Sequence, residues 1–134
     1  MAQHHVHLGK AGMFWQMAQK KFAAGVTPFV CINLVMYAVG HYIEALLARQ
    51  NRHPSSPPRG VPHADREVML RKYLVARNIV AEKWADVYSE LVGRRDTFIE
   101  GGVPDRRSVE EYMALAAPLI EYLGTRLSTN DDAS

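Results

Sequence analysis

The sequence predicts an all-α protein, built as an antiparallel up-and-down four-helix bundle in one domain. Apolar residues recur at steps of three and four along four segments, which is the period of an α-helix. No segment shows the strict alternation of a half-buried strand, and 134 residues is an ordinary length for one domain. We expect the bundle to span residues 1–128 and residues 129–134 to form a disordered acidic tail.

The first two helices are separated by a short turn with clear stop and start signals. Leu8–Ala24 carries an apolar face, and Gly25 is a typical C-terminal stop because glycine adopts the left-handed conformation readily. Thr27 and Pro28 follow, as an expected N-cap and first helical residue. The second helix, from Pro28 to about Gln50, is apolar almost all round, so we expect it at the centre of the bundle.

After the second helix, the sequence predicts a Pro-rich loop and a long third helix. Residues 51–62, "NRHPSSPPRGVP", hold four prolines and form the loop. The third helix is expected to begin at Ala64 or Asp65 and to continue to about Arg94. Its apolar stripe is Met69, Tyr73, Ala76, Val80, Trp84, Val87 and Leu91.

The fourth helix follows a glycine turn. "GGVPD" forms the turn, and Ser108 and Glu111 have the spacing of a capping box that starts the helix. Pro118 lies inside this helix, where its missing N–H predicts a kink.

Bulk properties exclude several classes of protein. The formal charge of +2 is too small to indicate nucleic-acid binding by itself. No signal peptide and no uninterrupted apolar run long enough to span a membrane is visible, and the lone Cys31 lies in an apolar segment typical of a buried thiol. We expect a cytoplasmic protein with no membrane association, and no cofactor motif such as a P-loop is present.

One group of polar residues follows the second helix and the loop. Tyr37, His41 and Glu44 interrupt the apolar run, and His41 and Glu44 share one helix face at a spacing of three. We interpret them as packing and register residues, with a hydrogen-bonded histidine pairing the carboxylate. The alternative is a metal site that adds His53 and His63, although one His-x-x-Glu pair supplies too few ligands and we predict no metal. Arg66 is expected near these histidines, at the loop end of the bundle.

A second group, of arginines, is expected at the opposite end of the bundle. It consists of Arg94, Arg95, Arg106 and Arg107. Guanidinium groups suit phosphate, so this cluster is our candidate for binding RNA or a nucleotide, with Asp96 orienting Arg95. Solvated arginines that interact with helix dipoles are the alternative.

Three segments together resemble the HEPN family, the higher eukaryotes and prokaryotes nucleotide-binding helical domain, in a bacterial branch. "MYAVGHYIEALLA" (36–48) is similar to its second-helix signature. "RHP" (52–54) followed by "HADR" (63–66) resembles its His-Pro…His-x-x-Arg link, and "YSELVGRRDTF" (88–98) resembles the segment that closes its third helix. The resemblance covers about Pro28 to Phe98.

This resemblance implies a four- or five-helix antiparallel bundle, often a homodimer. Active members are metal-independent endoribonucleases with an Arg followed four to six residues later by a His. Here, with four to six residues between them and Arg95, the positions offered to that histidine are Glu100, Gly101 and Gly102, so the motif histidine is absent. On one continuous third helix, His63 would lie about 45 Å from Arg95 and His41 about 30 Å from it, at 1.5 Å per residue.

The sequence therefore favours a non-catalytic HEPN-like module that dimerises and binds RNA, a nucleotide or a protein partner. By family analogy, that partner would be a nucleotidyltransferase-type antitoxin. One alternative is a metal-independent endoribonuclease of toxin or defence type, in which Arg95 and Asp96 work with an unidentified base. The other alternative is a metal-dependent helical-bundle enzyme.

Overall fold

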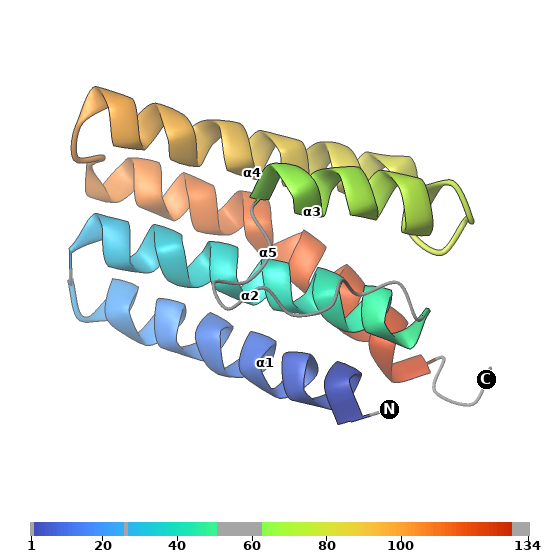
Figure 1. The fold of residues 1–134 in the computed structure, drawn as a ribbon. Coiled ribbons are helices and arrows are strands. Elements are labelled where there is room, and N and C mark those ends of the chain that lie inside the picture. Colours follow the sequence, from blue (N-terminus) through green and yellow to red (C-terminus); the bar gives the residue numbers. More distant parts are fainter. Residues whose placement is uncertain (1, 26, 51–62, 130–134) are drawn as a thin grey trace.

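A computed structural model shows an all-α protein in which the helices lie side by side (Figure 1). The backbone is described for residues 2–25, 27–50 and 63–129, and the side chains for 9–25, 27–50 and 65–128. The described elements are α1 (Ala2–Ala23), α2 (Pro28–Arg49), α3 (His63–Met69), the π-helical segment η1 (Leu70–Val75), α4 (Glu82–Gly101) and α5 (Arg106–Thr129). The prediction of an all-α class is confirmed, and no strand occurs among these residues.

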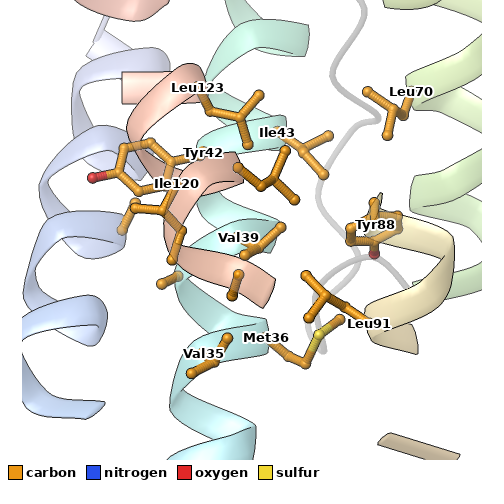
Figure 2. Close-up of a cluster of buried hydrophobic side chains, with 14 of the residues drawn as sticks. Val35, Met36, Val39, Tyr42, Ile43, Leu70, Tyr88, Leu91, Ile120 and Leu123 are labelled. Carbon is orange, nitrogen blue, oxygen red and sulfur yellow. The ribbon is translucent and has the colours of Figure 1, made fainter. Parts of the chain in front are cut away.

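The second helix is the centre of the fold, as its composition predicts. α2 packs against every other helix, whereas the backbone of α1 lies close to that of α2 alone, and α1 lies at the edge of the molecule in Figure 1. In the core, Val39 and Ile43 of α2 lie between Leu70 on one side and Leu123 of α5 on the other (Figure 2). Burying a Val or Leu side chain contributes about 1.5–3 kcal/mol, so the many buried apolar residues of α2 contribute substantially to stability.

The turn between α1 and α2 has the predicted glycine but not the predicted cap. Gly25 has φ +72°, the left-handed conformation expected of a helix stop. Thr27 precedes Pro28 as predicted, but its side chain makes no capping hydrogen bond, so the prediction of a threonine cap was wrong in this respect. The carbonyl oxygen of Thr27 accepts a hydrogen bond from the Val30 N–H at 3.0 Å.

The long third helix that the sequence predicts is in fact two helices. The helical path ends after η1 and turns at Asn78, which has φ +61°, a conformation that asparagine tolerates better than most residues. Ile79 and Val80 both donate their N–H groups to the Leu74 carbonyl, and Ala81 is extended before α4 begins. The Ala81 N–H donates to the Tyr122 hydroxyl of α5 at 3.1 Å, so a tertiary contact fixes the reversal.

The two halves of this predicted helix form an antiparallel hairpin. The Ser89 hydroxyl of α4 donates to Glu67 at 2.6 Å, and Arg71 donates to Asp86 at 3.1 Å and to Ser89 at 2.9 Å. The apolar stripe conceals the break because side chains on both arms, such as Leu74 and Leu91, enter the same core.

The last helix begins earlier than predicted and with a different cap. Asp105 is the capping residue: its Oδ1 accepts the N–H of Ser108 at 2.8 Å. The predicted capping box led by Ser108 is therefore wrong, because Ser108 already lies in the first turn of α5. The preceding turn uses Gly102 at φ +98°, as the glycine pair predicts. α5 continues through Pro118 and includes Thr129, at which the sequence predicts the start of the tail. The Pro-rich loop at 51–62 and residues 130–134 lie outside the described residues.

The Asp105 cap predicts a pH-dependent stability. Its hydrogen bonds to Ser108 hold the pKa of the Asp105 carboxyl below the ordinary value of 3.8. A carboxyl whose pKa is lowered in the folded state stabilises the fold above its unfolded-state pKa, and this contribution disappears as the pH falls through the folded-state pKa. Urea denaturation should therefore show Asp105→Ala less stable than wild type at pH 7, with a gap that closes below pH 3.8. Asp105→Asn, which caps equally well, should show no such closing gap.

Candidate functional site

A row of polar side chains follows one face of the otherwise apolar central helix. Asn33, Tyr37 and His41 are spaced by four residues, so they form a single ridge along α2, and Glu44 continues it one turn further. The two ends of the row are contacted by arginines from other helices. Arg95 of α4 reaches Asn33, and Arg66 of α3 reaches Glu44.

The Glu44 end of the row is a buried ion pair. Oε2 of Glu44 accepts hydrogen bonds from Nε of Arg66 at 3.0 Å and from its Nη2 at 2.5 Å. The two side chains are 5% and 9% exposed, respectively. Nη1 of Arg66 also lies 3.4 Å from the Tyr88 hydroxyl, whose pKa is raised by burial, so that tyrosine stays neutral beside the balanced pair.

Gly40 makes room for this ion pair. A Cβ built at residue 40 would lie 2.8 Å from Cζ and 2.9 Å from Nη1 of Arg66, closer than side-chain atoms pack. The guanidinium therefore lies directly against the backbone of α2, one helical turn before Glu44. Nothing in the sequence alone marks Gly40 as special, because its role is defined by a residue of another helix.

Glu44 has a partner that the sequence interpretation did not include. We expected His41 to pair with this carboxylate, and the structure adds Arg66 as a buried cationic partner. His41 also stacks on Phe14 of α1, with the ring centroids 5.5 Å apart and the planes 13° apart. The ring of Phe14 also lies 5.4 Å from that of Tyr37, which is 51% exposed. Tyr37, His41 and Glu44 thus contact α1 and α3 through partners that sequence spacing does not reveal.

The other end of the row holds Arg95. Its Nε donates to Oδ1 of Asn33 at 3.2 Å, and its side chain is 24% exposed. Asp96 lies 3.9 Å away, longer than a strong charge-assisted bond, so Asn33 is the closer of its two partners. Sequence reasoning missed Asn33, although a single polar residue at residue 33, four before Tyr37, was an available signal.

The four arginines of the predicted cluster face different ways. Arg94 is bound to Glu90 of its own helix at 2.6 Å and lines a hollow of about 510 Å³ between α4 and α5 that also contains Glu111. Arg106 donates to the Phe22 carbonyl at 3.1 Å and lies over the Phe22 ring. Arg107 is 86% exposed beside Glu111. Only Arg95 among them reaches the polar row of α2.

The hairpin also changes the expected position of the histidines relative to Arg95. The pairing of Glu67 with Ser89 and of Arg71 with Asp86 fixes an antiparallel register. Continued by one turn, that register places the backbone of His63 level with Gly93, so the expected 45 Å separation from Arg95 was wrong. Likewise, Arg95 is bound to Asn33, and His41 is eight residues from Asn33 along α2, a rise of about 12 Å. The expected separation of 30 Å between His41 and Arg95 was therefore too long. His53 lies outside the described residues.

Two further features concern metal and thiol chemistry. Among the described side chains, no group of three or more His, Cys, Asp or Glu residues could hold a metal ion. Cys31 is buried, as predicted, and burial raises the pKa of its thiol, which makes it a poor nucleophile.

Charge is distributed unevenly along the chain. All fourteen acidic residues lie at or beyond Glu44, whereas the first 43 residues contain three lysines, Lys10, Lys20 and Lys21. α1 and the first part of α2 therefore form an acid-free part of the fold, with the aromatic contacts of Phe14 at its centre. The small total charge conceals this asymmetry.

Comparisons with known proteins place no further constraint on this site. No protein-family model, curated protein or solved structure matches the chain. By length and composition α2 could cross a membrane, but 72% of its most apolar window is buried inside the fold, as in the core helix of a bundle.

Proposed function

We propose that this protein is a HEPN-like helical module that binds RNA at the polar row of α2, with Arg95 as the phosphate contact. The observation that carries this proposal is the Arg95–Asn33 hydrogen bond, which holds a guanidinium at the border of the acid-free part of the fold. This bond uses Nε, and the contact of Nη1 with Asp96 is long at 3.9 Å, so the two terminal nitrogens can make a bidentate contact with a phosphate.

The buried ion pair supports the family assignment. Each of the three segments that resemble the family contributes one member of the cluster: Glu44, Arg66 and Tyr88. The three segments are distant in sequence, but one residue of each meets the others in the core. A shared fold would keep such residues for packing, whether or not the protein is catalytic. In this proposal, α1, α2, α4 and α5 are the four long helices of the family bundle, and α3 with η1 is an additional short arm.

Arg95 and Arg94 provide a matched pair of variants to test the proposal. Arg95 faces α2, whereas Arg94 faces Glu90 and a hollow lined by two carboxylates that disfavour phosphate. Fluorescence anisotropy with a labelled RNA, in chelator, should show Arg95→Ala binding about tenfold more weakly or worse, as for a lost charge-assisted contact. Arg94→Ala should bind within about twofold of wild type, the effect expected of an exposed charge. Equal losses in the two variants, or no binding by wild type, would contradict the proposal.

A metal-independent endoribonuclease is the second candidate, favoured by the chain reversal at Asn78. The reversal brings the backbone of His63 to the level of Gly93, two residues from Arg95. Arg95 would stabilise charge on the phosphate while a base accepts the ribose 2′-hydroxyl proton. Cleavage of RNA that resists chelator and is lost in both Arg95→Ala and His63→Ala would favour this candidate. Intact RNA after long incubation with wild type would exclude it.

A further inference from the structure

The most exposed aromatic ring of the described core helices lies beside the proposed phosphate contact. Tyr37 is 51% exposed, although it belongs to α2, the helix with the most buried residues. It lies one turn, or about 6 Å along the helix, from Asn33, which holds Arg95. Because Arg95 is bound to Asn33, the exposed ring and the guanidinium belong to neighbouring turns along one face of α2.

The Tyr37 ring packs against a second aromatic ring from α1. The ring centroid of Phe14 lies 5.4 Å from that of Tyr37 and 5.5 Å from that of His41, on which it stacks. This second layer restricts the tyrosine side chain, so less conformational freedom would be lost when a flat ligand stacks on the exposed part of the ring. Among the described residues, Tyr37 belongs neither to the buried hydrophobic cluster nor to the side chains packed against it, so this part of the core does not account for the arrangement.

The charges around the ring match an anionic partner. On α1, Lys10, Phe14, Met17 and Lys21 follow steps of four, three and four, so they share one face, and the contact of Phe14 with Tyr37 shows which way that face points. Both lysines are exposed, and α1 contains no acidic residue. Lysines that flank an aromatic platform are typical of proteins that bind single-stranded nucleic acid.

We propose that Tyr37 is a stacking platform for an unpaired base, so that the ligand of this surface is single-stranded RNA. This inference rests on the function proposed above and adds the class of RNA. Bases in a duplex are already stacked on their neighbours and present only their edges in the grooves, so they cannot lie on Tyr37 while a phosphate contacts Arg95. Unpaired bases of any sequence have a free face, which predicts weak sequence preference.

The test compares an unstructured 12-nucleotide RNA with a duplex of the same length by fluorescence anisotropy. Wild type should bind the single strand more tightly. Tyr37→Ala should weaken single-strand binding by about 5- to 150-fold, the range for a lost base–aromatic stack, and leave duplex binding unchanged. Tyr37→Trp should retain single-strand affinity and report stacking by quenching of the added indole fluorescence. Val68→Ala, at an apolar residue of α3 that is 62% exposed, is the surface control.

The outcomes separate this inference from the proposal on which it rests. If Tyr37→Ala binds the single strand like wild type while Arg95→Ala does not, RNA binding stands and the platform is wrong. If wild type prefers the duplex, single-strand recognition is wrong. If wild type binds neither RNA, or binds only phosphatidylserine vesicles, both ideas are overturned. Circular dichroism of Tyr37→Ala should match wild type, since the side chain is half exposed.

Discussion

Glu44→Ala is expected to lower the free energy of unfolding by about 3–5 kcal/mol, because it leaves the Arg66 guanidinium buried without its counter-charge. The arginine side chain is only 9% exposed and its guanidinium lies against Gly40 of α2. A domain of this size is stable by about 5–15 kcal/mol, so the loss is a large part of the total. Urea denaturation followed by circular dichroism measures it.

Two further variants show whether burial is the cause. Glu90→Ala breaks the exposed Glu90–Arg94 pair, which has a similarly short contact of 2.6 Å, and should cost no more than about 0.5 kcal/mol. The double variant Glu44→Leu with Arg66→Met removes both buried charges and should recover most of the lost stability. Equal effects of Glu44→Ala and Glu90→Ala would show that the ion pair is not a buried determinant of the fold.

Gly40→Ala is expected to destabilise the protein by about 1–3 kcal/mol, although alanine is the better helix former. The added methyl would lie 2.8 Å from Cζ of Arg66, so the guanidinium must leave its place and its hydrogen bonds to Glu44 must lengthen. Thermal and urea denaturation both measure this effect.

Gly93→Ala is the matched control for that substitution. Gly93 lies in α4, and a Cβ added there meets no atom within 4 Å. Alanine should therefore stabilise the protein by up to about 1 kcal/mol through helix propensity alone. The two substitutions are chemically identical and opposite in predicted sign. A stabilising effect of Gly40→Ala would mean that the guanidinium does not lie against α2 in solution.

The candidate site was partly visible in the sequence. Tyr37, His41 and Glu44 could be singled out because polar residues are rare in an apolar helix, and Arg95 because of the arginine-rich stretch around it. Their partners could not be identified in the same way. Arg66 is 22 residues from Glu44, and Arg95 is 62 residues from Asn33, so each pairing depends on how the helices are placed in space.

The error in the third helix had a single physical cause. Hydrophobic periodicity reports which side chains are buried, and both arms of the hairpin bury theirs in one core. The reversal depends on Asn78 in the left-handed conformation and on the hydrogen bond from Ala81 to Tyr122, and neither leaves a trace in the apolar pattern. That one error also produced the false separation between the histidines and Arg95.

The sequence by itself determined the helical class, the central position of α2 and the turn at Gly25, because each follows from local periodicity, composition or backbone preference. Only the tertiary structure decided that α3 and α4 form a hairpin and that Arg66 pairs with Glu44 while lying against Gly40. It also decided that Arg95, alone among the four arginines, is hydrogen-bonded to Asn33. These features arise from contacts between distant segments, whose free energies depend on the relative placement of the helices.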